Sequence, residues 1–376
     1  MSHREANTLS EARPRDMKDL FRETLMRKAS DLHLTAFMPP VFRIKGQLHS
    51  MNCDAYQPED IEKLLDEILM PRHREVLASK RSVDFALSVP DVGRFRLAAF
   101  YQRGALSLAV RLLADGIPTL QSLGLPETIG TLSHLRDGLV LLTGVTGSGK
   151  TTTLATILDS INGSSRQNII TIEDPIEYVH QNNLSVIHQR ELHSDVLSFP
   201  DALRDALRAD PDVILVGEMR DLDTMRTAIM AAETGHLVFS TLHSRDCIST
   251  INRMVGAFPA GEQTQIRQQL SATLKAVVSQ RLLPNAADTG RVPAVELMIS
   301  TPGIANLIRQ GKDDMIYSAI ETGVQQGMQT MEQCLIRLIE EGKISLETGL
   351  AAARDESFLK RRLDSRRAAA KGVRVC

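Results

Sequence analysis

A loop that could bind phosphate begins at Gly144. Its letters GVTGSGKT fit the pattern G-x-x-x-x-G-K-[ST], after an apolar run and before a helical one. Glycines let backbone N–H groups turn toward phosphate oxygens, and the start of a helix adds partial positive charge. Lys150 would neutralise the β- and γ-phosphates, and Thr151 would offer its hydroxyl to Mg²⁺. We therefore predict a nucleotide site built from Gly144, Val145, Thr146, Gly147, Ser148, Gly149, Lys150, Thr151 and Thr152.

A carboxylate follows another apolar run at Glu218. The letters DVILVGE over 212–218 are typical of a buried strand that ends in an acidic turn. Ligands of open α/β sheets bind at the carboxyl ends of the strands. A carboxylate there can polarise the attacking water or hold a water of Mg²⁺, so we predict that Glu218 acts in hydrolysis of a nucleoside triphosphate.

Two further groups of polar residues flank apolar runs. The acidic box TIEDPIE over 171–177 crowds three carboxylates at a strand end, where Mg²⁺ and nucleotide would relieve their repulsion; a solvated acidic loop is the alternative. His236 and His243 flank the run LVFSTL and could report phosphate occupancy. A lone histidine is more often structural, so spacing alone leaves the role of this pair open.

The elements that must position these residues alternate along the second half of the chain. The β-rich runs GLVLLTG, NIITIED, DVILVGE and HLVFSTLH are separated by helical stretches. This order predicts an α/β fold, a parallel-rich sheet with helices on both faces. After Pro302 the pattern becomes helical and ends in a basic tail.

The first half of the chain predicts a smaller α+β domain. A helix is expected from Met17, strands over 31–34, 41–48, 84–89 and 94–100, and a second helix from Pro58 to Leu69. The stretch 114–130 contains prolines and glycines typical of an interdomain linker. The predicted organisation is a disordered extension over 1–16, an α+β domain over 17–113, the linker over 114–130, an ATPase-type core over 131–300, a helical region over 301–355 and the basic tail over 356–376.

Length and composition exclude several classes of protein. A chain of 376 residues, 43% hydrophobic and 24% charged, is typical of two globular domains and not of a disordered or fibrous protein. A net charge of −2, 4% aromatic residues and no tryptophan argue against nucleic-acid binding. Met1–Asp16 lacks the apolar segment of a secretory signal, so we expect a cytoplasmic protein. The four cysteines form no C-x-x-C pair, which argues against a zinc site or a disulfide framework.

Taken together, four boxes resemble those of the type II/type IV secretion ATPase superfamily, and are most similar to the PilT-like pilus retraction ATPases. The boxes are GVTGSGKT, TIEDPIEY, LRDALRADPDVILVGEMRD and AETGHLVFSTLH, in this order. Shorter matches lie at Ala29–Leu34, Gly93–Arg96 with Phe100–Arg103, and Gly327–Thr330. The resemblance extends from about Met17 to about Asp355.

This resemblance implies a RecA-like P-loop core, a PAS-like N-terminal domain, and ATP with Mg²⁺ bound between them. By motif, Lys150 and Thr151 would bind phosphate and Mg²⁺, Glu218 would be the general base, and Glu177 would orient water or metal. His236 and His243 would be the histidine-box residues. The family also uses N-terminal arginines that reach the γ-phosphate, although an exposed strand face would explain them equally well; the candidates are Arg94, Arg96, Arg103 and Arg111.

The same resemblance implies a motor. ATP hydrolysis in a homohexamer would rotate each N-terminal domain against its core about the linker, and force would pass to an inner-membrane pilus platform protein. Pilin subunits would then leave the pilus base, which is pilus retraction and underlies twitching motility. The enzyme would be cytoplasmic and peripheral at the inner membrane.

Two departures from the family leave room for related functions. Retraction enzymes resemble one another in a segment A-I-R-N-L-I, whereas this chain has alanine, Ala305, at the arginine position. An accessory retraction motor that works beside a paralogous pilus ATPase is therefore one alternative. Val145 replaces a usual proline and leaves every phosphate ligand in place.

Two more distant classes of ATPase also remain possible. Pilus assembly and type II secretion ATPases commonly carry a recruitment domain and a paired C-x-x-C insertion, neither of which this chain has. RecA-like nucleic-acid translocases share the expected core, but the composition of this chain offers few aromatic side chains for stacking on bases.

Overall fold

The computed structural model describes residues 12–113 and 116–370, which form two compact units. Unit 1 contains the chain up to Gly116 together with two short segments, Asp174–Val179 and His193–Asp195. Unit 2 contains the remainder. Each unit has its own hydrophobic core, so each is described by itself.

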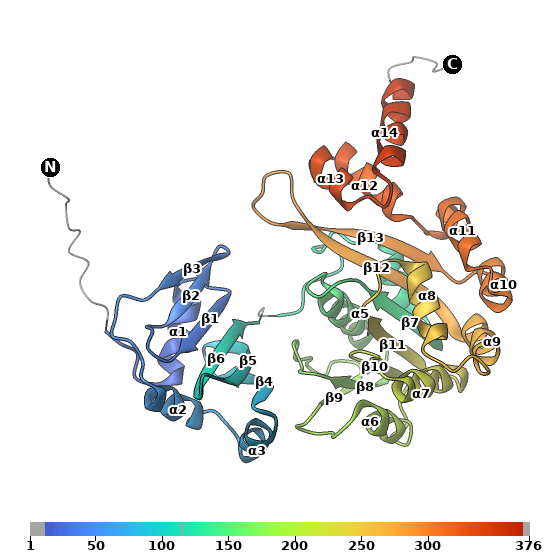
Figure 1. The fold of residues 1–376 in the computed structure, drawn as a ribbon. Coiled ribbons are helices and arrows are strands. Elements are labelled where there is room, and N and C mark those ends of the chain that lie inside the picture. Colours follow the sequence, from blue (N-terminus) through green and yellow to red (C-terminus); the bar gives the residue numbers. More distant parts are fainter. Residues whose placement is uncertain (1–11, 114–115, 371–376) are drawn as a thin grey trace, which may run out of the picture. The chain divides into compact units, whose positions relative to one another are not determined.

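Unit 1 is an α+β domain, as predicted. Its six-stranded sheet has the order β3-β2-β1-β6-β5-β4, and every neighbouring pair is antiparallel (Figure 1). The elements are α1 (Met17–Met26), β1 (Asp31–Thr35), β2 (Val41–Ile44), β3 (Gln47–Ser50), α2 (Pro58–Asp66), α3 (Pro71–Lys80), β4 (Ser82–Val89), β5 (Gly93–Gln102) and β6 (Ala105–Leu112).

Period-two alternation builds the core of unit 1. Along β5, Phe95, Leu97 and Ala99 are fully buried, because successive side chains of a strand point to opposite faces. Phe95 stacks on Phe21 of α1 with ring centroids 4.3 Å apart, which fixes this helix on the sheet.

Residues 12–16, which we expected to be disordered, lie against α2. The Arg13 guanidinium lies 2.6 Å from a carboxylate oxygen of Asp60 and 4.0 Å from the ring centroid of Tyr56. The Tyr56 hydroxyl donates to the carbonyl of Pro14 at 2.8 Å. The predicted disordered extension over 1–16 therefore reaches too far toward α1. Contacts of polar side chains hold residues 12–16 although this segment has no apolar pattern. Residues 1–11 lie outside the described residues.

Unit 2 is the predicted α/β core. Its seven-stranded sheet has the order β13-β12-β7-β11-β10-β8-β9; β13 is antiparallel and the others are parallel (Figure 1). The strands are β7 (Gly138–Thr143), β8 (Asn168–Glu173), β9 (Val186–Glu191), β10 (Val213–Val216), β11 (Leu237–Leu242), β12 (Leu274–Pro284) and β13 (Arg291–Ile299).

Helices cover both faces of this sheet. Alternate residues of one strand enter different cores: Leu139 and Leu141 of β7 pack with α6 to α11, whereas Val140 and Leu142 pack with α4 and α5. Continuous apolar runs are therefore required, because neither face is open to water. The helices are α4 (Glu127–Thr131), α5 (Lys150–Ser164), α6 (Phe199–Ala206), α7 (Leu222–Glu233), α8 (Cys247–Gly256), α9 (Gln263–Thr273), α10 (Pro302–Gln310) and α11 (Ile316–Thr322).

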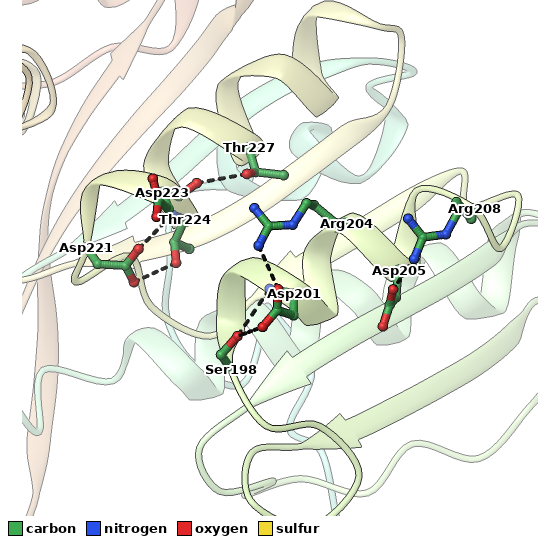
Figure 2. A network of polar contacts seen from close by, with 9 residues as sticks. All are labelled: Ser198, Asp201, Arg204, Asp205, Arg208, Asp221, Asp223, Thr224 and Thr227. Carbon is green, nitrogen blue, oxygen red and sulfur yellow. Dashed lines mark hydrogen bonds and ion pairs between the residues drawn. The ribbon is translucent and has the colours of Figure 1, made fainter.

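Side-chain caps begin α6 and α7 at fixed residues, as Figure 2 shows. Ser198 Oγ accepts from the Asp201 amide at 3.3 Å, and Asp221 Oδ1 accepts from the Thr224 amide at 2.8 Å. Such caps satisfy N–H groups that lack a partner in the first turn, typically for about 1 kcal/mol each. The Asp221 cap also determines where the turn after β10 ends.

The linker is shorter than predicted, because the division between the units lies between Gly116 and Ile117. Leu120 and Leu125 pack on the core that contains α4 and α5. Gly327 approaches α4 so closely that a Cβ there would lie 2.3 Å from Thr128 Oγ1. Most of the predicted 114–130 segment is thus part of unit 2; residues 114–115 lie outside the described residues.

The predicted basic tail continues the helical region. After α12 (Met331–Glu340) and α13 (Leu346–Ala352), α14 (Glu356–Ala370) packs Leu359 and Leu363 into a shared core. Lys360, Arg362 and Arg366 form ion pairs with Glu356, Glu321 and Glu340. We expected a basic tail, separate from the helical region, from 356; through Ala370 this segment is a helix, because its leucines are spaced four residues apart. Within the described ranges no helix is long and apolar enough to cross a membrane.

Candidate nucleotide site

The predicted phosphate loop lies between the carboxyl end of β7 and the first turn of α5. Gly149 is the N-cap of α5 with a φ of 89°, a left-handed conformation that favours glycine. At Gly144, with a φ of 144°, a Cβ would lie 2.3 Å from the carbonyl oxygen of Gln280 on β12. Both glycines are therefore required by the backbone, and the strand, loop and helix have the arrangement that binds phosphate.

Lys150 is buried at the start of α5, with 8% of its surface exposed. Its Nζ donates to the carbonyl oxygens of Gly144 at 2.8 Å and Val145 at 3.1 Å. Ser148 Oγ is buried and has no hydrogen-bond partner in the described part of the chain. An ammonium group that bends back onto its own loop and an unpaired buried hydroxyl fit a site made for phosphate oxygens.

The other loop residues fit the same ligand. Val145, Thr146 and Gly147 form the exposed turn of the loop, and Thr151 and Thr152 lie in the first turn of α5. Thr151 presents a hydroxyl oxygen and Glu218 a carboxylate, the hard oxygen donors that Mg²⁺ prefers. These residues therefore fit a magnesium nucleotide.

Glu218 lies in a turn that neighbouring strands hold in place. The turn is fixed by backbone bonds from Gly217 N to Ile172 O at 2.8 Å and from Met219 N to Thr241 O at 3.2 Å. The Thr241 hydroxyl also donates to Gly217 O at 2.6 Å. With 13% of its side chain exposed, Glu218 is a fixed carboxylate at the carboxyl edge of the sheet, where it can orient or deprotonate a water.

His243 follows β11 and meets Glu218. Its Nε2 lies 3.6 Å from one oxygen of Glu218, while Arg220 contacts the other oxygen at 2.6 Å. Burial and the positive charge of Lys150 lower the pKa of His243, and the Glu218 carboxylate opposes this shift. The imidazole is thus neutral at neutral pH and can accept or donate one hydrogen bond beside the carboxylate.

The structure separates the two histidines of the histidine box. His236 precedes β11, at the amino end of the strand, and its Nδ1 lies 3.0 Å from the carbonyl oxygen of Ala231. Lys150, Glu218 and His243 all lie at the opposite edge of the sheet, so His236 is not brought together with them.

The acidic box is divided as well. Glu173 ends β8 in unit 2 and accepts from the hydroxyl of Thr171 at 2.6 Å. Glu177 belongs to a segment counted with unit 1, where it lies 3.4 Å from Arg96. Glu177 therefore does not belong to unit 2, which contains the phosphate loop.

The four candidate arginines all lie in unit 1, on β5, β6 and the turn between them. Arg94 donates to the carbonyl of Ile176 at 2.8 Å and to Ser88 Oγ at 2.7 Å. Arg96 and Arg111 are cross-strand partners, and Arg111 pairs with Asp31 at 2.9 Å. Arg103 has a φ of 48° in the hairpin turn. They share one hairpin, and their reach toward a nucleotide stays a prediction.

Sequence reasoning missed two residues of this site. Gln280 accepts from Thr153 Oγ1 at 2.9 Å and lies against Gly149, where a Cβ would be 2.7 Å from its Nε2. Arg220 pairs with Glu218. Arg220 lies two residues after Glu218 in the sequence GEMR, and this closeness in sequence could have identified it. No local pattern in the sequence identifies Gln280.

Comparisons with known proteins show what this chain is similar to. The model of the family described as type II/IV secretion system protein matches residues 10–348. The chain is 44% identical over 339 residues to the type IV pilus retraction ATPase PilT of Pseudomonas aeruginosa, which covers 90% of this chain and 98% of PilT. It is 38% identical to the type IV pilus ATPase PilU of the same organism, with 90% and 88% covered. A crystal structure of the pilus retraction motor PilT with bound ADP matches with a TM-score of 0.86 at 47% identity, covering 92% of this chain and 99% of that chain.

The chain therefore belongs to the type II/IV secretion system protein family. Within it, the chain is a PilT-like enzyme that binds nucleotide and hydrolyses ATP. The resemblance read from four sequence boxes is confirmed over almost the whole length of PilT.

Proposed function

We propose that this chain is the subunit of a hexameric ATPase motor that drives retraction of type IV pili, and thereby twitching motility. One observation carries the proposal: Lys150, Glu218 and His243 meet at one sheet edge in a chain that aligns with 98% of a pilus retraction ATPase. The resemblance adds a homohexamer, a location at the cytoplasmic side of the inner membrane and a pilus platform protein as partner.

The proposed chemistry follows from the positions of the residues. Lys150 leaves the carbonyl oxygens of its loop and binds the β- and γ-phosphates of ATP. Thr151 would hold the magnesium ion, which when bound would neutralise charge that builds up on the phosphates. Glu218 orients the water and accepts its proton, and Arg220 and His243 hold this carboxylate in place. Glu177 and His236 are proposed to assist from other positions, as orienting and sensing residues.

The proposed motion uses the division between the two units. A ligand can drive motion only if it contacts two states differently. Arg94, Arg96, Arg103 and Arg111 are candidates to contact the γ-phosphate across a domain or subunit boundary, and their contact would be lost after hydrolysis. The linker near Gly116 would then be the hinge between the units.

An experiment in cells tests the function directly. The gene is deleted, the pili are labelled, and their extension and retraction are filmed. We expect retraction to be lost, or to be reduced where a second motor shares the work, and to be restored by the wild-type gene but not by a Glu218→Gln copy. Unchanged retraction, in a strain that still assembles pili but from which every other retraction ATPase gene has also been deleted, would contradict the proposal.

Ala305 favours a second candidate, an accessory retraction motor. It lies on α10, outside the phosphate loop and the Glu218 turn, at the position where retraction enzymes have arginine. If that arginine transmits force, this chain hydrolyses ATP normally but needs a paralogous ATPase for full retraction. The two candidates differ in one outcome: retraction persists after deletion of an accessory motor and is abolished after deletion of the principal motor.

A further inference from the structure

The loop that carries His243 is fastened to the strand that carries the phosphate loop. We define the His243 loop as residues 243–246, between β11 and α8. Thr143, the last residue of β7, lies directly before Gly144 and is fully buried. Its Oγ1 accepts from the Ser244 amide at 2.8 Å and lies 3.0 Å from the Ser244 carbonyl oxygen, to which it can donate.

The Thr143 hydroxyl can both accept hydrogen bonds from the His243 loop and donate hydrogen bonds to it. A hydroxyl can donate one hydrogen bond while it accepts others, which neither an apolar side chain nor a carbonyl can do. A second acceptor, the carbonyl oxygen of Leu242, lies 3.2 Å away. A backbone amide that loses its partner in a buried place is unfavourable, so the Ser244 amide constrains where the loop can move.

Other contacts hold the far end of the same loop. Ser279 Oγ donates to the carbonyl of Arg245 at 3.0 Å, and the Cys247 amide donates to the buried carboxylate of Glu296 at 2.8 Å. The exposed Arg253 donates to the carbonyl of His243 at 3.0 Å. Thr143 differs from all of these, because it is adjacent to the phosphate loop in the chain.

We propose that Thr143 is a positioning residue that couples the phosphate loop to the His243 loop. When Gly144 moves as nucleotide binds, the hydrogen bonds of the Thr143 hydroxyl move Ser244 with it. This movement positions His243 beside Glu218. Thr143 acts through Ser244 and belongs to no catalytic group itself. The inference rests on the proposed function and adds a residue that couples the two loops of its nucleotide site.

The test compares Thr143→Val, which keeps the shape and removes the hydroxyl, with Thr143→Ser, which keeps the hydroxyl. The control is Thr227→Val, because the buried Thr227 hydroxyl donates to the Asp223 carbonyl within α7, away from the site (Figure 2). We expect Thr143→Val to lower kcat about tenfold or more, since small misplacements of catalytic groups are costly, while KM for ATP changes little. Thr143→Ser and the control should stay close to the wild-type kcat.

A second measurement does not depend on hydrolysis. Hydrogen exchange of the segment 243–246 is followed with and without ADP. In the wild type we expect ADP to slow exchange in this segment, and in Thr143→Val we expect that response to be lost although ADP still binds. Should the valine variant not fold, Thr143→Ala replaces it.

Either of two kinetic results would overturn the inference: wild-type kcat in the variant without the hydroxyl, or a serine variant as impaired as the valine variant. An ADP response that persists without the hydroxyl would do the same. If the wild type hydrolyses no ATP, the proposed function fails instead, and the exchange measurement still decides whether the two loops are coupled.

Discussion

At the scale of single residues, the tasks proposed for Lys150 and Glu218 differ, and mutations can separate them. Lys150 is buried and already bound to two carbonyl oxygens of its own loop, so it is ready to exchange them for phosphate oxygens. Glu218 is held by its turn and by Arg220. In the proposed mechanism, Lys150 provides the charge that binds phosphate and Glu218 provides the proton acceptor.

We expect Glu218→Gln to bind ATP like the wild type and to lose turnover by about a hundredfold or more, the usual contribution of a positioned base. Lys150→Ala should lose turnover and also weaken binding, because its charge acts in the ground state and in the transition state. Steady-state ATPase rates and binding of a fluorescent nucleotide measure both effects. Glu233→Gln is the control, since that carboxylate accepts from Gln269 on the surface. Turnover within about threefold of wild type in Glu218→Gln would exclude this residue as the base.

His180 predicts how stability depends on pH. Burial lowers the pKa of His180 below its ordinary value of 6.5, despite the opposing charge of Asp159, and its buried Nδ1 has no partner among the described residues. Below pH 6.5 the unfolded chain then binds a proton that the folded chain does not, so stability falls as the pH falls.

Thermal unfolding at a series of pH values from about 7.5 to 5 checks this linkage. We expect Tm of the wild type to fall toward acid more steeply than Tm of His180→Gln. Lowered pKa values at His73 and His243 contribute to both curves, so the difference between the curves isolates His180. Parallel curves would show that the histidine does not titrate as its burial requires.

At the scale of elements, α14 is part of the folded core of unit 2. Leu359 and Leu363 are buried against α12 and α13, and the basic residues on its other side form ion pairs with the same unit. Deleting the chain after Phe358 would therefore remove core residues together with basic charge.

We expect Leu363→Ala to destabilise the protein by about 2 to 4 kcal/mol, because it empties a buried leucine site that surrounding helices cannot fill. Arg361→Ala changes an exposed residue on another side of the same helix. Its free energy of unfolding should stay within about 0.5 kcal/mol of the wild-type value. Chemical denaturation of both variants gives the comparison. Equal stabilities would mean that α14 is not docked.

At the scale of the whole molecule, the candidate arginines and the phosphate loop lie in different units. If Arg94, Arg96, Arg103 or Arg111 acts in trans, ATP turnover requires assembly. Specific activity in a dilution series should then fall as sedimentation shows the hexamer dissociating. Arg103→Ala should lower activity only at concentrations at which the wild type is assembled. Constant specific activity from hexamer to monomer would exclude arginines that act in trans.

The sequence by itself determined the local parts of the site. The phosphate loop, the Glu218 turn and His243 were found because each is coded by adjacent residues after an apolar run, and parallel strands must end at one edge. The α/β and α+β classes followed from periodicity for the same reason. The family resemblance then extended these local patterns to an expected function.

Only the tertiary structure decided which of these parts are neighbours. The strand order β7-β11-β10 places His243 between the phosphate loop and Glu218, although β11 follows β10 in sequence. The contacts of Thr143 and Gln280 arise from strands far apart in the chain, and β12 and β13 were not predicted. Strand order and docking of the chain's ends depend on burying surfaces that are distant in sequence, so no local pattern records them.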